Sequence, residues 1–238
     1  MRTLDWGFML DCIKPIFLHG IPVAIKIAVV AFVFGGLIGI AVALIKIYNV
    51  PVLKQIAALY ISLFRGTPLL VQILLFYYGL PILINNLCYL NGWDFNINSV
   101  PTIVFLFIVY SLNAGSYMSE SIRSAILSVN RGQWEAGHSI GMSTPMIWRR
   151  IVFPQAVKVA LPNLGNSFIS LTKESSLAFV VSIRDVLGEA KVIAGRSTRF
   201  FEAYIVAAAA YWLICIICEF ILKKLEQRSR RHERKDSL

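Results

Sequence analysis

Polar side chains recur at helical spacing within an apolar stretch in the middle of the chain. Asn113, Tyr117 and Glu120 follow one another at i, i+4 and i+7, so they share one face of a helix. Polar groups are expensive at membrane depth, where they mark either contacts between helices or a transport path. Both interpretations stay open for Asn113 and Tyr117. For Glu120 we expect an ion pair at the membrane boundary with Arg123, one turn further on, or with Arg131.

A second polar stripe follows in a later apolar stretch. Asn163, Asn166, Ser170 and Lys173 recur there at i, i+3, i+7 and i+10, and Glu174 comes directly after them. Adjacent residues on a helix point about 100° apart, so Lys173 and Glu174 cannot both face one ligand squarely. From Asn166 to Glu174, these side chains are candidates for the lining of a path, with a structural or gating role as the alternative.

The residue types that catalysis or a bound metal would need do not form a recognisable group. The chain has no phosphate loop of the GxxxxGK[ST] type and no HExxH motif. His19, His138 and His232 are isolated in sequence. The C-x-x-C of Cys215 and Cys218 lies in an apolar run, where both thiols should pack as small hydrophobes. We therefore predict no catalytic residue, metal or cofactor, and no means of hydrolysing ATP within this chain.

Composition places the two stripes in a membrane. Hydrophobic residues make up 57% of the 238 positions, charged residues only 15%, and the mean hydropathy is +0.68. A water-soluble domain has about a quarter of its residues charged, so we predict a single all-α, polytopic membrane domain over residues 1–238. Apolar stretches of about 20 residues indicate five spans, although the pattern also allows four or six. The five spans are residues 21–45, 67–85, 101–122, 156–183 and 203–222.

The distribution of Lys and Arg orients these spans. Basic residues occur after the first span, in the connector 123–155 and in the tail 223–238, whereas none occurs in residues 66–122. The connector 184–202 also contains basic residues and is an exception, partly offset by acidic ones. We expect the N-terminus outside and the C-terminus in the cytoplasm. The basic tail should contact anionic membrane lipids and not nucleic acid.

A glycine pair in the first span allows close packing between helices. The run "GGLIG" places Gly35 and Gly39 four residues apart, as in a GxxxG motif. The partner helix belongs either to a second copy or to the same chain, and the sequence does not distinguish them.

A polar segment within 123–155 contains the glycine and proline residues that typically start and end short helices, and their spacing predicts two such helices. Gly141 closes the first helix, and Pro145 lies early in the second, which Pro154 is expected to end. Glu135 lies near the start of the first helix, where a carboxylate suits the helix dipole. We predict a structured cytoplasmic protrusion that either presents a surface to a partner or packs on the protein's own spans.

The spacing within this protrusion resembles the EAA loop of ABC importer permeases, E-A-A-x3-G-x9-I-x-L-P. The matching residues are Glu135, Ala136, Gly137, Gly141, Ile151 and Pro154. Gly137 stands where a third alanine is usual, and Phe153 stands where leucine is common. The resemblance implies that the loop forms a coupling helix seated in a groove of a cytoplasmic ATPase subunit, and that this partner binds the ATP.

Three longer stretches resemble the polar-amino-acid branch of these permeases, and the cystine-type members most of all. They are Tyr60–Pro81, Gly115–Ala136 and Phe153–Leu177. The resemblance implies the ABC importer permease fold, a bacterial plasma membrane as the location, and L-cystine as substrate. A glutamine, arginine, histidine or glutamate type is the alternative substrate. It also implies three partners: ATPase subunits, an extracytoplasmic solute-binding protein, and a second permease, identical or homologous. The rival is a self-contained secondary transporter, but we see no internal repeat of the kind that many such proteins carry.

The second polar stripe also fits this substrate class. An amino acid offers a carboxylate and an ammonium, and Lys173 and Glu174 carry the opposite charges. The family often has Lys-Asp-Thr-Ser where this chain has Lys173-Glu174-Ser175-Ser176. The carboxylate and hydroxyl groups of the motif are therefore retained, although two residues differ.

Overall fold

The computed structural model describes residues 4–230, and this range contains helices and turns but no β-strand, which confirms the predicted all-α class. Residues 231–238 of the predicted basic tail lie outside the described residues. The α-helices are α1 (Trp6–Pro15), α2 (Ile21–Ile47), α3 (Leu53–Gly66), α4 (Leu69–Leu74), α5 (Leu80–Asn91), α6 (Thr102–Leu127), α7 (Arg131–Ser139), α8 (Thr144–Ile147), α9 (Phe153–Glu174), α10 (Val186–Ser197) and α11 (Phe200–Arg230). The π-helical turns Ile16–Gly20, Leu75–Gly79 and Trp148–Val152 connect neighbouring helices, and the 3-10 segments are Ile97–Ser99 and Ser175–Val181.

Four helical segments among the described residues are long and apolar enough to cross a membrane. They are Trp6–Ile47, Leu69–Asn91, Thr102–Leu127 and Phe200–Ser229. The remaining predicted span, 156–183, overlaps the 22 residues of α9 and the 3-10 segment after it. α9 packs along α6 and α11, but its polar stripe makes it less apolar than the four membrane-length segments.

The main core lies where α2 packs against α6. A Cβ added to Gly35 would lie 2.8 Å from the Cβ of Ala114, and one added to Gly39 would lie 3.1 Å from the backbone nitrogen of Ser119. These separations are shorter than ordinary van der Waals contact, so only glycine lets the two backbones approach this closely. The GxxxG pattern therefore packs α2 against α6 of the same chain.

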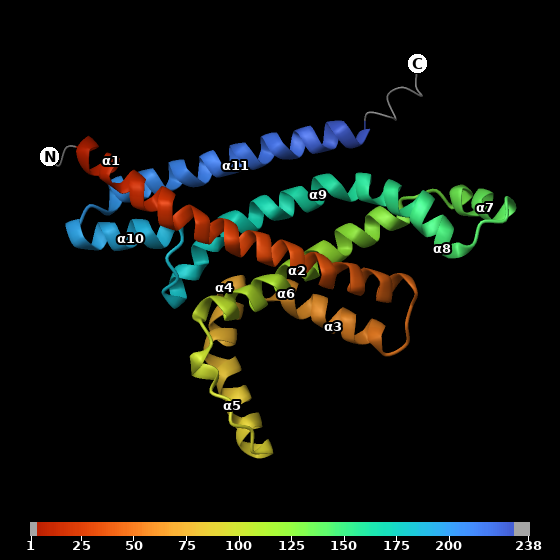
Figure 1. The fold of residues 1–238 in the computed structure, drawn as a ribbon, viewed down its shortest axis with the longest axis horizontal. Coiled ribbons are helices and arrows are strands. Elements are labelled where there is room, and N and C mark those ends of the chain that lie inside the picture. The colour runs from red at the N-terminus through yellow and green to blue at the C-terminus, as the bar shows by residue number, and fades with distance from the viewer. Residues whose placement is uncertain (1–3, 231–238) are drawn as a thin grey trace.

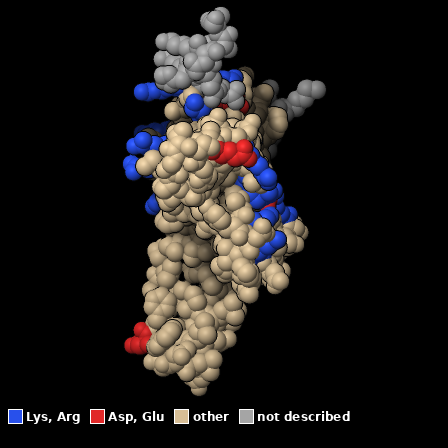
Figure 2. All heavy atoms as spheres, turned by 90° about the vertical axis from the view of Figure 1, so that its right-hand side faces the viewer, with Lys and Arg blue, Asp and Glu red and all other residues tan. Residues whose placement is uncertain are grey.

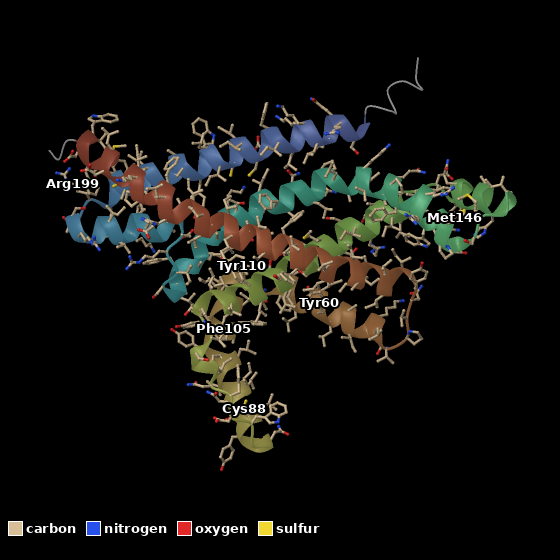
Figure 3. The ribbon with its side chains drawn as sticks, in the orientation of Figure 1. Tyr60, Cys88, Phe105, Tyr110, Met146 and Arg199 are labelled. Atoms are coloured by element: carbon tan, nitrogen blue, oxygen red, sulfur yellow. The ribbon has the colours of Figure 1, made fainter. Side chains whose placement is uncertain are left out.

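A second core lies at the end of the bundle that carries the N-terminus. Small buried side chains from α1, α10 and α11 meet there, among them Cys12, Ala190 and Ala207. Arg199, at this end in Figure 3, forms an ion pair with Asp5 at 2.8 Å and so connects the start of α11 to the start of α1. The N-terminal helix is thus part of the folded bundle.

One segment leaves the bundle. Figure 1 shows most helices running along the long axis of the molecule, while α4 and α5 project away from it. We call Leu69–Asn91 the arm. Only 11% of its most apolar window is buried, and residues 66–93 contain no charged side chain. The arm therefore presents an apolar surface that the rest of this chain does not cover.

The predicted end of a helix at Pro154 is wrong. The helix continues from Thr144 to Glu174 through Pro154, which lies in the first turn of α9. Proline lacks an N–H and its ring clashes with the carbonyl four residues earlier in an α-helix. The π-helical turn Trp148–Val152 widens the helix immediately before this point, which accommodates the ring without a break.

Candidate functional site

The polar protrusion predicted from the sequence forms a compact unit at one end of the bundle. We call residues 130–156 the α7–α8 module; Met146 marks its position in Figure 3. The module has its own small core, in which Ile147 and Val152 are fully buried. The rings of Trp134 and Trp148 meet edge to face with centroids 5.4 Å apart. Such aromatic pairs add about 0.5–1.5 kcal/mol beyond burial, so the module has internal stiffness.

A glycine turn closes α7. Gly141 has φ +78, a left-handed conformation that side chains disfavour. Its N–H donates to the carbonyl of His138 at 2.9 Å, and the N–H of Met142 donates to the carbonyl of Gly137 at 3.0 Å. This pair of hydrogen bonds is the Schellman motif, which satisfies the last carbonyls of a helix. Gly141 thereby fixes the angle between α7 and α8.

Gly137 on α7 packs closely against Ile147 on α8. A Cβ at this position would lie 2.9 Å from Cγ1 and 3.0 Å from Cδ1 of Ile147. An alanine, the residue usual in the family at this position, would require Ile147 to move by a few tenths of an ångström. The departure from the E-A-A pattern therefore matches the packing of Ile147 in this chain.

The remaining module residues named from the sequence divide into two groups. Glu135, Ala136, Gly141 and Pro154 are exposed, whereas Ile151 is partly buried against the module core. Ile140, next to the glycine turn, is 77% exposed. A rigid helix thus presents a carboxylate, a small residue and an exposed apolar side chain on a surface that the chain itself does not cover.

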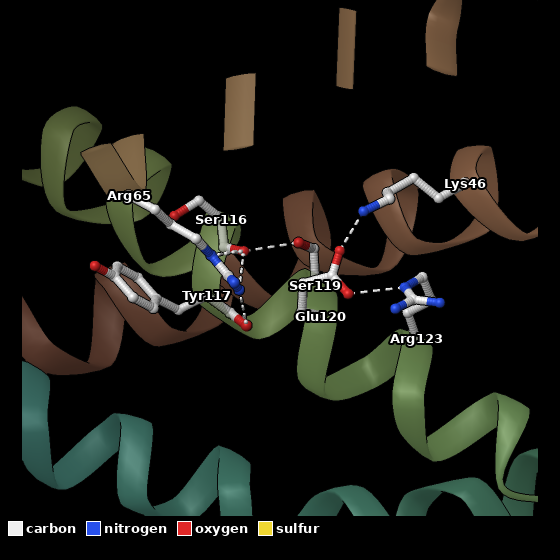
Figure 4. Close-up of polar contacts among 7 residues, drawn as sticks. All are labelled: Lys46, Arg65, Ser116, Tyr117, Ser119, Glu120 and Arg123. Carbon is white, nitrogen blue, oxygen red and sulfur yellow. Dashed lines mark hydrogen bonds and ion pairs between the residues drawn. The ribbon is translucent and has the colours of Figure 1, made fainter. Parts of the chain in front are cut away.

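Glu120 lies in an ion-pair cluster near the module end of α6. Its carboxylate accepts from Arg123 Nε at 2.8 Å and also pairs with Lys46 Nζ at the end of α2 (Figure 4). The pair with Arg123 matches the sequence prediction, and Arg131 is not a partner in this cluster. Sequence reasoning did not find Lys46, because it lies 74 residues away and only tertiary packing brings it near.

Arg65 reaches the middle of α6. Its Nη2 donates to the carbonyls of Ser116 at 2.8 Å and Tyr117 at 3.1 Å, and its guanidinium carbon lies 4.9 Å from the centre of the Tyr117 ring (Figure 4). Tyr117 is 49% exposed. The side chain of Tyr117 is therefore held from one side and open on the other.

Asn113 is used inside the protein. It is buried, and its Nδ2 donates to Oε1 of Gln72 at 2.9 Å. The Nε2 of Gln72 in turn donates to the carbonyls of Phe64 at 2.9 Å and Thr67 at 3.0 Å, at the break between α3 and α4. This arrangement favours the interpretation of Asn113 as a contact between helices. Its amide holds Gln72 at the base of the arm, where α3 ends and α4 begins. Gln72 lies 41 residues from Asn113 in sequence, and no local pattern marks it.

The stripe on α9 faces outward. Asn163, Asn166, Ser170 and Lys173 are all exposed in this single chain. Glu174 is only partly exposed, and its carbonyl accepts from the hydroxyl of Tyr110 at 2.7 Å. On a helix that crosses a membrane, a row of exposed polar groups would require water or another polar surface beside it.

Comparisons with known proteins cover nearly the whole chain. The family described as binding-protein-dependent transport system inner membrane component matches residues 35–231. YxeN of Bacillus subtilis (strain 168), named a probable amino-acid permease protein, is 38% identical over 96% of this chain and 97% of its own. The L-cystine transport system permease protein TcyB of the same strain is 35% identical over 97% of this chain and 93% of its own.

Solved structures agree with the family. The crystal structure of an amino acid ABC transporter with histidines has a chain that superposes with a TM-score of 0.80 at 34% identity, covering 95% of this chain and all of that one. The MetNI methionine ABC transporter gives a TM-score of 0.72 at 14% identity, which shows the fold alone. These matches confirm the predicted ABC importer permease fold. The chain belongs to the family of binding-protein-dependent transport system inner membrane components, among relatives that are amino-acid permeases, and is a multi-pass inner-membrane transport subunit and not an ATPase.

Proposed function

We propose that the chain is the permease through which an ATP-driven importer takes up a polar amino acid, with L-cystine as the first candidate. The 35% identity to an L-cystine permease over nearly the full length supports this choice. A relative named for glutamine transport, GlnP of Rickettsia bellii (strain RML369-C), is 34% identical over 88% of this chain. A glutamine-type substrate is therefore the alternative.

The observation that carries the proposal is the construction of the α7–α8 module. Its core and its glycine turn make it rigid, yet Glu135 and Ala136 remain exposed on its surface. In the proposed mechanism, this surface sits in a groove of the ATPase subunit. Because the module joins α6 to α9 directly, a push on α7 moves both helices together.

The orientation of the chain follows from its charge. Figure 2 views the end that carries the module, where Lys and Arg gather on both flanks and the projecting arm shows none. Arg131, Arg149 and Arg150 on the module are exposed. Because basic residues favour the cytoplasmic side, we place the module and the end of α11 in the cytoplasm and the N-terminus outside.

Two exposed surfaces support a second permease. The arm is apolar and uncovered, and the stripe from Asn166 to Lys173 on α9 is polar and uncovered. A two-fold pair of permeases would cover the arm and enclose a wet path beside α9. In this arrangement Asn166, Ser170 and Lys173 line the path, whereas Asn113 holds the arm in place.

The test is uptake by the complete importer in proteoliposomes, with its ATPase and binding protein. Labelled L-cystine should accumulate only with ATP, and an ATPase whose catalytic site is inactivated should abolish accumulation. Competition by unlabelled glutamine, arginine, histidine and glutamate identifies the substrate. Uptake that persists with the inactive ATPase would contradict the ABC mechanism, while stronger competition by glutamine than by cystine would replace the substrate.

A further inference from the structure

An open cavity lies at the end of the bundle opposite the α7–α8 module. Its lining comes from the π-helical turn Ile16–Gly20 with the start of α2, from the start of α6, and from the connector into α10 with the first turn of that helix. The cavity measures about 890 Å³, within the range of small-molecule sites. α6 runs from Thr102 at the cavity to Leu127 near the module, and its 26 residues separate the two by about 39 Å. In the proposed orientation the cavity faces the side from which the binding protein delivers its substrate.

Opposite charges line this cavity. Arg184 is exposed just before α10, and Glu189 is partly exposed in the first turn of α10. Among the ion pairs of residues 4–230, none joins Arg184 to Glu189. Further polar groups come from His19 before α2, from Thr102 at the start of α6, and from Ser182 in the connector before α10. The cavity therefore offers a cation and an anion that do not neutralise each other by direct contact.

A buried anchor holds the segment that carries both charges. Asp185 lies between them in sequence and is fully buried. Its carboxylate accepts from the N–H of Gly188 at 3.0 Å, from the hydroxyl of Ser175 at 3.2 Å and from the hydroxyl of Tyr211. Burial raises the pKa of the Asp185 carboxyl, while these hydrogen bonds favour its charged form. The anchor fixes the start of α10 against the 3-10 segment and α11, so Arg184 and Glu189 project from a rigid base.

We infer that this cavity is an outer receiving site for a zwitterionic amino acid, whose carboxylate binds Arg184 and whose ammonium binds Glu189 before the substrate enters the transmembrane path. The inference rests on the proposed function, because it takes the transported solute to be an amino acid. Glu189 repels a simple anion, and Arg184 repels a simple cation. The pair thus favours a ligand that carries both charges on groups attached to the same carbon.

The test uses the complete importer in proteoliposomes, with labelled L-cystine as the probe and the binding protein at saturation. Arg184→Gln and Glu189→Gln should each lower the uptake rate by about fivefold, since each leaves one charge of the ligand unpaired. The Kd of the loaded binding protein for the complex should change by less than about twofold, because the lost contact is with the small ligand. Arg184→Lys keeps the positive charge and should retain most of the uptake.

Two charged residues outside the cavity provide matched controls. Arg196→Gln on α10 and Asp11→Asn on α1 remove exposed charges near the same end and should leave uptake unchanged. Normal uptake in both cavity variants would overturn the inference. So would a loss explained by weaker binding of the binding protein, which would make the cavity a protein-docking surface. If the unmodified importer takes up no amino acid at all, the proposed function itself fails.

Discussion

The α7–α8 module lies at one end of the helical bundle and the arm projects from its side, and the two are built in different ways (Figure 1). The module has its own core around Ile147, a glycine-capped turn and a basic surface. The arm has little buried surface and no charge. A segment that lies in water and passes a partner's motion to the bundle needs internal stiffness. A segment that lies among lipids or against another membrane helix needs only an apolar surface and hydrogen-bonded backbone groups. The difference supports the proposal that the module binds a cytoplasmic partner and that the arm binds a partner within the membrane.

The largest effect is expected from a charge on the arm. Leu83 is 61% exposed on α5, and in the proposed pair of permeases Leu83→Arg would place a guanidinium where the second copy covers the arm. An unpaired guanidinium buried in this apolar interface should reduce the dimer by more than about tenfold, because its charge has no partner there. Crosslinking and mass analysis in nanodiscs measure the dimer, with Leu83→Met as the matched control. An unchanged dimer would mean that lipid alone covers the arm.

The root of the arm should be the next most sensitive position. Gln72→Leu removes the acceptor of the buried Asn113 amide and the donor to the Phe64 carbonyl, both at 2.9 Å, and leaves only the 3.4 Å contact between Asn113 Nδ2 and that carbonyl, at a cost of about 1–3 kcal/mol. Thermal unfolding in detergent measures this loss. Gln72→Leu combined with Asn113→Leu should cost less than the sum of the two single changes, because the partners are removed together. Strictly additive losses would show that the two amides do not act as a pair.

In the α7–α8 module, the position most sensitive to substitution should be the glycine turn at Gly141. Gly141→Val forces a β-branched residue into the left-handed conformation at φ +78, which costs about 1–2 kcal/mol or more. Uptake should fall by about tenfold while membrane insertion and the dimer stay normal. Gly195→Ala is the control, since a Cβ there meets nothing within 4 Å. Normal uptake by Gly141→Val would show that the angle between α7 and α8 does not matter.

The smallest effect is expected near the module end of α6. Glu120→Gln weakens the ion pairs with Lys46 and Arg123, whose side chains are all 23–33% exposed. Partly exposed pairs contribute about 0.2–1 kcal/mol, and salt screens them. The loss in thermal stability should therefore shrink at high salt. A loss that is large and independent of salt would indicate that the cluster has a packing role beyond its charge.

The sequence predicted the module better than the arm for a physical reason. Glu135, Gly137 and Gly141 lie within one short segment, so cap chemistry and spacing describe them without knowledge of the tertiary fold. The class of the fold likewise follows from composition and helical periodicity. The resemblance to the EAA loop then added a partner that cap chemistry alone could not name.

Long-range packing explains what the sequence did not predict. Gln72 and Lys46 lie 41 and 74 residues from their partners on α6, and their own neighbours in sequence do not mark them. The direction in which the arm leaves the bundle depends on the helix break at Thr67. The carbonyl of Thr67 accepts a hydrogen bond from the side-chain amide of Gln72. Pro154 was expected to end a helix, and only the π-helical turn before it reveals why the helix continues.

The most direct test of the account is the contact between α7 and the ATPase. Glu135→Lys reverses the exposed charge on the module, and Gln133→Lys adds the same lysine about 200° away on the same helix. With permease and ATPase co-expressed, we expect Glu135→Lys to lose ATPase co-purification or ATP-dependent uptake while still inserting in the membrane, and Gln133→Lys to retain both. Normal co-purification and normal uptake by Glu135→Lys would contradict the assignment of α7 as the coupling helix.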